Sequence, residues 1–243
     1  GSSEMIRMTI ICGQIWTNIS NDTSGFGKLL YIDIVNTGSG TMVYLTGQDT
    51  VLFRASVGTS DWERMSFLEE SLYDGETFYA TDFSQSGDTF ITVGNFGVIN
   101  ARYSSSNKKT FTNLLKAGNI NKVWAESFTD RVITAGDFTN NNSNDNIMYS
   151  TNGGGNWELS NYPPGSPQQI YDMEMINNMT GYVMGIRKEL NKVMKTTDGG
   201  VNWTTESSTV GTDLNKVTFI NDSLGYVVGN AGVILKTTVN IIV

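Results

Sequence analysis

The chain has 243 residues, of which 39% are hydrophobic, and its formal net charge is −8. An acidic chain of this kind binds phosphate backbones poorly, which argues against nucleic acid as a partner. It contains no histidine and a single cysteine, Cys12, which excludes an internal disulfide, His-dependent nucleophile pairs and histidine-rich zinc sites.

The N-terminus begins with GSSE, residues 1–4, which we interpret as an expression scar. No apolar run reaches 18 residues, so the sequence predicts no membrane span. The length and hydrophobic content fit one large domain or two small ones, and we expect a single domain over residues 1–243.

Two markers recur along the chain. Aromatic residues end similar segments at positions 16, 62, 111, 157 and 203, and a glycine ends a short apolar run at positions 47, 94, 136, 185 and 229. Both markers repeat with a period of about 46 residues. A period of this size, built from short strands, is typical of a propeller.

Each repeat is expected to contain four strands. In the last repeat, residues 216–221 would form the first strand, YVVG up to Gly229 the second and VILKTT the third, with an aromatic box before the fourth. No helical period persists over a useful length. The sequence therefore predicts an all-β fold, a five-bladed β-propeller of four-stranded antiparallel blades.

The chain begins with an orphan box end at Trp16, whereas the last repeat stops before its own aromatic residue. We expect the N-terminal strand through Trp16 to complete the blade formed by 213–243 and so close the ring, which removes exposed sheet edges. The alternative is a piece of a longer propeller with six or seven blades.

The best-formed box is KTTDGGVNW, and its key residues are Thr196, Asp198, Gly200 and Trp203. The preceding repeat carries a second good copy, STNGGGNW, with Ser150, Asn152, Gly154 and Trp157. The acidic or amide residue is expected to accept backbone N–H bonds in a turn, the glycine to supply positive φ, and the Trp to cover the turn. We therefore expect a mainly structural role, a stapled hairpin.

These two boxes resemble Asp boxes, the bacterial neuraminidase repeat. The run VTFINDSLGYVVGNAGVILKTT resembles blades of the photosystem II assembly-factor propellers and of related secreted bacterial repeat proteins, and the resemblance covers about residues 145–243. It implies a β-propeller and favours a secreted, periplasmic or particle-surface location. It implies little about activity, because Asp boxes occur in sialidases, other glycosidases, sorting receptors and plain binding modules.

Aligning the first strand of each repeat by its end places four carboxylates at one position: Asp33, Asp82, Glu126 and Glu174, with Thr218 in the fifth repeat. First strands are innermost in a propeller, so these residues could form an acidic ring near the channel. Bonding to backbone or Ser/Thr between blades is the favoured interpretation. A calcium or other cation site is the second, since calcium suits carboxylate oxygens, and no other cofactor is expected. Catalysis is the third.

The catalytic interpretation rests on the order Asp33, Asp82, Glu126, which resembles five-bladed glycosidases of the arabinanase and fructosidase type. Those enzymes lack this box repeat, and none of their flanking motifs is present here. The arginine context of sialidases is also missing. An enzyme is therefore the less favoured class.

Loops that join successive repeats, and loops between second and third strands, should share one face of a propeller. Candidate ligand-binding residues in these loops are Phe26, Tyr73, Phe138, Tyr162 and Arg187. Aromatic rings beside Asn and Asp suit a glycan or a peptide. We expect a non-catalytic binding or scaffolding propeller that recognises a glycan or protein partner. A glycosidase-like enzyme and an assembly factor for a larger complex are the alternatives.

Overall fold

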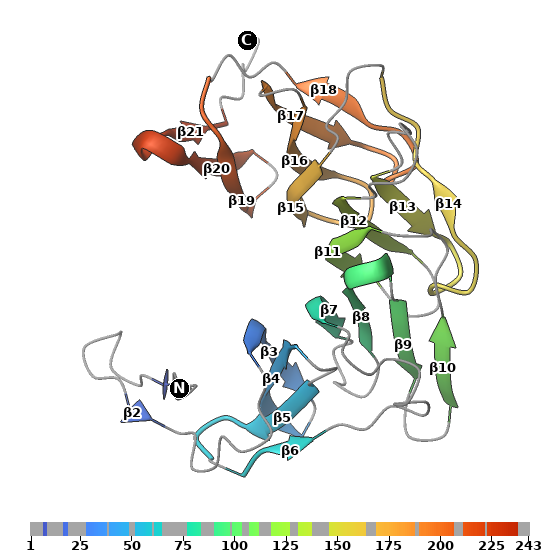
Figure 1. The fold of residues 1–243 in the computed structure, drawn as a ribbon, viewed down its shortest axis with the longest axis vertical. Coiled ribbons are helices and arrows are strands. Elements are labelled where there is room, and N and C mark those ends of the chain that lie inside the picture. Colours follow the sequence, from blue (N-terminus) through green and yellow to red (C-terminus); the bar gives the residue numbers. More distant parts are fainter. Residues whose placement is uncertain are drawn as a thin grey trace.

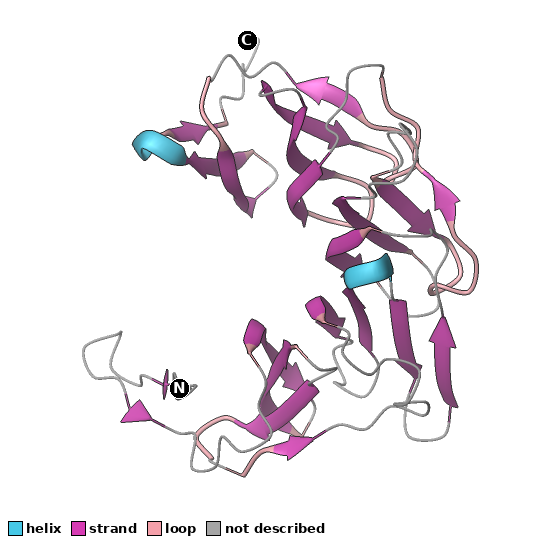
Figure 2. Cartoon of the chain, viewed as in Figure 1, coloured by secondary structure: helices cyan, strands magenta, loops and turns pink. Residues whose placement is uncertain are grey.

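The computed structural model of the chain consists almost entirely of strands and turns (Figure 2). Helix occurs in its described part only as the 3₁₀ segments η2 (Asn95–Gly97) and η3 (Asn230–Gly232). The residues that the structure describes are 7–8, 17–18, 28–37, 39–48, 52–59, 61–64, 77–83, 90–97, 99–103, 107–111, 118–126, 131–137, 146–163, 169–187, 190–206, 211–221 and 223–237.

The strands form antiparallel sheets in which neighbours in the chain are neighbours in the sheet. Four sheets have four strands, and a fifth has three among the described residues. In chain order the strands are β3 (Leu29–Thr37), β4 (Gly40–Gly47), β5 (Leu52–Ser56) and β6 (Glu63–Arg64); β7 (Phe78–Phe83), β8 (Phe90–Gly94), β9 (Ile99–Tyr103) and β10 (Asn107–Phe111); β11 (Asn119–Ala125), β12 (Val132–Asp137), β13 (Ile147–Ser150) and β14 (Glu158–Leu159); β15 (Gln169–Met175), β16 (Gly181–Arg187), β17 (Leu190–Thr196) and β18 (Thr204–Glu206); and β19 (Leu214–Asn221), β20 (Leu224–Gly229) and β21 (Ile234–Lys236).

The sheets follow one another along an arc, with the first strand of each sheet on the inner side (Figure 1). These inner strands, β3, β7, β11, β15 and β19, each contact the next one in the series. The expectation that the first strand of each repeat is innermost is confirmed. The repeat in the sequence therefore corresponds to one sheet, and successive sheets pack face to face.

Every inner strand carries a β-bulge near its start, and the recurring glycine lies directly opposite it. The first residues of the bulges, called bulge residues below, are Leu29, Phe78, Ile120, Ile170 and Leu214. A Cβ atom on Gly94 would collide with the backbone carbonyl of Thr77, and one on Gly229 with that of Asp213. The glycine marker is thus a steric requirement of a close backbone approach.

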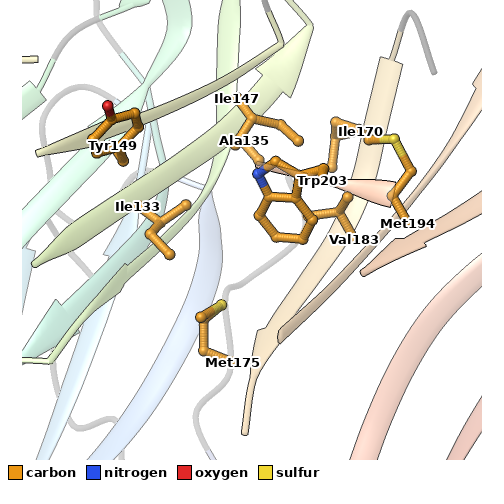
Figure 3. Packing of buried hydrophobic residues seen from close by; sticks show 9 residues of the cluster. All are labelled: Ile133, Ala135, Ile147, Tyr149, Ile170, Met175, Val183, Met194 and Trp203. Atoms are coloured by element: carbon orange, nitrogen blue, oxygen red, sulfur yellow. The ribbon is translucent and has the colours of Figure 1, made fainter. Parts of the chain in front are cut away.

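A core cluster of buried side chains lies between the third and fourth sheets (Figure 3). Trp203 is 2% exposed and lies against Ala135 and Ile147 of the third sheet and Val183 of the fourth. A Trp that fills the space between two sheets buries a large apolar area in both. The box residue therefore fixes the turn and also joins neighbouring sheets.

Closure of the ring by the N-terminal strand is not among the described pairings. In the short sheet of β1 (Arg7–Met8) and β2 (Thr17–Asn18), β2 pairs with β1, and the described pairings of β21 are with β20 alone. Trp16 lies outside the described residues. The all-β architecture of repeated antiparallel sheets is confirmed, whereas the closed ring of five blades stays a prediction.

Candidate functional site

The carboxylates of the inner strands bond to backbone, chiefly across the joints between sheets. Asp82 accepts hydrogen bonds from the N–H of Phe83 in its own strand, at 2.8 Å, and of Ala125 in the next sheet, at 2.6 Å. Glu174 in the fourth sheet accepts the N–H of Phe219 in the fifth, at 3.0 Å. Asp33 accepts the N–H of Ile34 at 2.7 Å. These contacts agree with the interpretation in which such carboxylates serve packing between blades.

A second carboxylate of the fourth sheet makes the same kind of joint. Asp172 is buried, accepts the N–H of Val217 at 2.9 Å and pairs with Lys122 at 2.8 Å and Lys216 at 3.5 Å. The two lysines come from the sheets on either side. A buried charge needs such partners, and Asp172 therefore ties three consecutive sheets together. Sequence alignment missed this residue because it lies two positions before the aligned one.

The alignment of Glu126 with the other carboxylates was wrong. Counted from the bulge residues, Asp33, Asp82 and Glu174 lie four positions on, and the residue at this position in β11 is Trp124. Glu126 follows the end of β11, and its Oε1 accepts a hydrogen bond from Asn178 at 2.6 Å. The strand ends earlier than the sequence suggested, which shifted the alignment by two residues. The Asp33, Asp82, Glu126 order therefore does not form a single ring.

Burial and crowding perturb the inner strands electrostatically. Burial raises the pKa of Asp82 to about 6; the hydrogen bonds from Ala125 and Phe83 oppose this shift, and the charge of Asp33 adds to it. Burial, with the negative charges of Asp33, Asp82 and Asp172, raises the pKa of Tyr31. The inner strands are thus an acidic environment, and Asp82 is the carboxylate there whose pKa is raised most clearly.

The box around Asp198 forms a compact hydrogen-bonded turn. The hydroxyl of Thr196 donates to Asp198 Oδ1 at 2.9 Å and accepts the N–H of Gly200 at 2.9 Å. Asp198 accepts the N–H of Asn202 at 2.9 Å, and the indole N–H of Trp203 donates to the Gly200 carbonyl at 3.0 Å. Gly200 has φ of 86°. The side chains of this motif are occupied within the turn, which supports a structural role.

The box in the preceding repeat has the same side-chain bonds within its turn. Ser150 Oγ donates to Asn152 Oδ1 at 3.0 Å and accepts the N–H of Gly154 at 2.8 Å, and Asn152 Oδ1 accepts the N–H of Asn156 at 2.8 Å. Gly154 has φ of 85°. Trp157, at the end of the box, packs on the core cluster of the second and third sheets. An amide therefore takes the place of the Asp198 carboxylate in the turn, whereas the buried indole N–H of Trp157 has no hydrogen-bond partner among the described residues, unlike that of Trp203.

Of the five predicted ligand-binding residues, the structure describes the side chain of Tyr162. Phe26, Tyr73 and Phe138 lie outside the described residues, as does the side chain of Arg187 at the end of β16. Tyr162 packs against the core cluster of Trp203, and its hydroxyl accepts the N–H of Asn146 at 3.0 Å. Tyr162 is therefore engaged within the fold, and the grouping of the five residues on one face stays a prediction.

A cavity of about 270 Å³ lies where the fourth and fifth sheets meet, lined by Tyr171, Asp213 and Asn215. Tyr171 and Asn215 each follow a bulge residue, and Asp213 precedes β19. Asn230 donates to Asp213 at 3.2 Å and accepts from Asn215 at 2.9 Å, which fixes the polar wall. These residues were missed in the sequence; their one signal is that they flank the bulges.

The wall of this cavity carries negative charge. Burial raises the pKa of the Tyr171 hydroxyl, and the charges of Asp213 and Asp137 add to the shift. Tyr171 therefore stays protonated and donates to Gln169 at 3.3 Å, while Gln169 donates to Asp137 at 3.0 Å. The arrangement offers a phenol, an amide and a carboxylate to a ligand, and its charge favours a cationic group.

The described residues include neither a cluster of metal-ligating side chains nor a membrane-spanning helix. They contain no group of three or more His, Cys, Asp or Glu side chains that could hold a metal ion, so the calcium prediction gains no support from them. Within the same part of the chain, no helix is long and apolar enough to cross a membrane.

Comparison with known proteins identifies the fold alone. No protein-family profile and no curated protein sequence matches the chain. Among solved structures, YCF48 bound to D1 peptide superposes with a TM-score of 0.64 and 16% identity over 94% of this chain and 70% of that chain. YCF48 from Cyanidioschyzon merolae superposes with a TM-score of 0.58 and 14% identity over 93% and 74%.

The similarity extends to propellers of a different type. The WD40 β-propeller domain of Doa1 superposes with a TM-score of 0.56 and 13% identity, over 86% of this chain and 67% of that chain. Identities this low establish the architecture only. The chain thus has the β-propeller type of fold, and its likeness to YCF48 agrees, at the level of the fold, with the resemblance to photosystem II assembly-factor propellers.

Proposed function

We propose that the chain is a non-catalytic binding or scaffolding module that recognises a segment of a protein partner. The observation that carries the proposal is the acidic cavity lined by Tyr171, Asp213 and Asn215. It lies at the end of the inner strands where the loops joining successive repeats arrive, the face on which we expect binding. The solved YCF48 structure with a bound D1 peptide supports a peptide as the class of ligand.

The cavity is large enough for one side chain of such a segment. A Lys, Arg or amide side chain would satisfy the Asp213 carboxylate and the Asn215 amide, and its aliphatic part would lie along the Tyr171 ring. Neighbouring loops would contact the rest of the peptide. The cavity would thus select for a basic residue, and affinity would depend on salt.

A glycan is the second candidate ligand, because a ring, an amide and a carboxylate on one wall also suit a sugar. The glycosidase alternative draws no support from the inner strands, where Glu126 lies out of register and both Asp82 oxygens accept backbone N–H groups.

The test compares peptide arrays that vary in basic content with a glycan array, using the purified chain. We expect peptides with Lys or Arg to bind, and Asp213→Asn to weaken that binding at least tenfold in fluorescence polarisation. Asp61→Asn, an exposed carboxylate after β5, is the matched control. Binding that is indifferent to Asp213→Asn would reject the cavity, and hydrolysis of aryl-glycosides would reject the non-catalytic class.

A further inference from the structure

The four joints between successive sheets use one recurring contact. The residue five positions after the bulge residue on an inner strand packs against a residue of the second strand of the preceding sheet. At two joints both partners are aromatic: Phe83 stacks on Tyr44 with ring centroids 3.9 Å apart, and Phe219 stacks on Tyr182 at 4.5 Å. At the other two joints, Ala125 packs in the cluster of Ile91, and Met175 in that of Ile133.

Each sheet therefore has two distinct faces. The leading face carries the second-strand residue and the inner-strand carboxylates, and it packs against the next sheet. The trailing face carries the residues three and five positions after the bulge residue, and it packs against the preceding sheet. The two faces fit each other at every joint of the arc, because the repeat places the same positions there.

The trailing face of the first sheet has no preceding sheet among the described residues. Ile34, five positions after its bulge residue, is 60% exposed, although its equivalents Phe83 and Met175 are each 8% exposed. Ile32, three positions after the bulge residue, is 56% exposed, whereas its equivalent Val217 is 1% exposed. Two neighbouring apolar side chains on one strand are thus largely exposed, whereas the equivalent side chains of the later sheets are buried or half-buried.

The leading face of the fifth sheet is exposed in the same way. Val228 pairs with Lys216, and Ile234 pairs with Val228. Lys216 is the equivalent of Asp172, whose carboxylate contacts the next sheet, so these residues belong to the leading face. Val228 and Ile234 are 42% and 69% exposed. Tyr226 pairs with Thr218, which lies four positions after the bulge residue. Tyr44 and Tyr182 pair with the equivalent residues of their own sheets, so Tyr226 is their equivalent in the fifth sheet. Tyr44 and Tyr182 each stack on the residue five positions after a bulge residue, and in the first sheet that residue is Ile34.

We propose that this chain associates head to tail, the leading face of β19–β21 in one copy packing on the trailing face of β3–β6 in a second copy. Tyr226 of one copy would cover Ile34 of the next, as Tyr44 covers Phe83 within the chain. The chain itself carries both complementary faces, at opposite ends of the arc (Figure 1). Such a contact is heterologous, so each added copy offers a new free face.

The N-terminal hairpin agrees with a blade at this joint. Met8 lies eight positions before Trp16 and pairs with Thr17, one position after it. Lys195 and Thr204 occupy the same positions relative to Trp203 and also pair with each other. The pair β1–β2 thus has the register of the third and fourth strands of a sheet. In the assembly, β2 supplies the fourth strand to the β19–β21 sheet of the other copy, and β21 displaces β1 beside it.

The experiment measures mass by size-exclusion chromatography with light scattering over a hundredfold range of concentration. Wild type should form oligomers that grow with concentration. Ile34→Asp removes one face and Val228→Asp the other, so each variant alone should be monomeric. Because each variant keeps the face that the other lacks, an equimolar mixture should form a dimer and nothing larger. Leu159→Asp, at an exposed position of β14, should behave as wild type.

Circular dichroism checks that the variants are folded, and Ile34→Thr with Val228→Thr serves as a milder pair. A wild type that stays monomeric overturns the proposal, and in that case lower melting temperatures for both Asp variants would indicate closure within one chain. Oligomers that persist in either single variant would place the association on another surface. A mixture that remains monomeric, or grows like wild type, would contradict head-to-tail pairing.

Discussion

Asp82 and Ala125 connect two neighbouring inner strands through a hydrogen bond of 2.6 Å from the Ala125 N–H to the Asp82 carboxylate. Two sheets further on, Glu174 accepts the N–H of Phe219, which lies at the place of Ala125 in its own strand. One side-chain oxygen therefore satisfies a backbone donor at the same place in two different joints. An oxygen acceptor at this position thus joins neighbouring sheets.

Protonation of Asp82 should make stability depend on pH. Its pKa of about 6 in the folded chain lies above the value of about 3.9 for an unfolded aspartate, so between these values the folded state binds more protons. Stability contributed by this group is present at low pH and is lost as pH rises through 6. Lowering the pH from 7 to 5 should therefore raise the melting temperature of wild type relative to Asp82→Asn. A difference between the two that is constant over this range would contradict the prediction.

Glu174→Ala should leave the Phe219 N–H without its acceptor and lower the free energy of unfolding by about 1–2 kcal/mol. Glu174→Gln keeps an oxygen at this place and should recover most of the loss. Chemical denaturation measures both, with Glu206→Ala on the exposed β18 as a control. Equal losses for Ala and Gln would show that charge, and not the acceptor, matters.

Trp203→Ala should reduce the free energy of unfolding by about 3–5 kcal/mol, since the ring is buried between two sheets. Trp157→Ala, in the half-buried copy, should cost less. The comparison by urea denaturation tests whether the box Trp acts through burial. Similar losses at the two sites would argue that the turn itself, and not the packing of the ring, sets the cost.

Asp198→Ala should cost about 1–2 kcal/mol of stability and leave ligand binding unchanged. Burial acts to raise the pKa of Asp198, but the hydrogen bonds from Asn202 and Thr196 outweigh it and lower the pKa. Its stabilising contribution is therefore present at neutral pH and lost as pH falls through the folded-state pKa. Lost binding with unaltered thermal stability would show instead that the box contacts the ligand.

Gly94→Ala should destabilise the chain strongly, because the new methyl group would overlap the Thr77 carbonyl. Gly211→Ala is the matched control, since its Cβ would meet no atom within 4 Å. Thermal denaturation should separate the two variants clearly. If both melt together, the bulge is able to relax and the close backbone approach is not required.

The sequence predicted the repeat, the strands and the inner place of each first strand, because glycine and aromatic markers report backbone and packing constraints directly. The glycine marker was read as the end of a strand; its cause, the bulge opposite, became visible only with the pairing register. Glu126 was misplaced because Ala125 is followed by ESFTD, a segment with no glycine or proline to mark where β11 ends.

The cavity was beyond sequence reasoning for a related reason. Tyr171 and Asn215 belong to different repeats and meet only because neighbouring sheets pack at a bulge. Neither residue has a pattern that distinguishes it from other polar positions at strand starts. Contacts between repeats depend on the angle between sheets, which a period of about 46 residues does not encode.

The joints between sheets also bear on how this chain could change over evolutionary time. Every joint brings together the same two places of the repeat, whichever side chains occupy them: Tyr44 with Phe83, or Ile133 with Met175. Duplication or loss of one whole repeat would therefore recreate a joint of the same kind at the seam. Gene rearrangements in multiples of the repeat would conserve the fold, whereas a shorter insertion within an inner strand would offset every contact downstream of it.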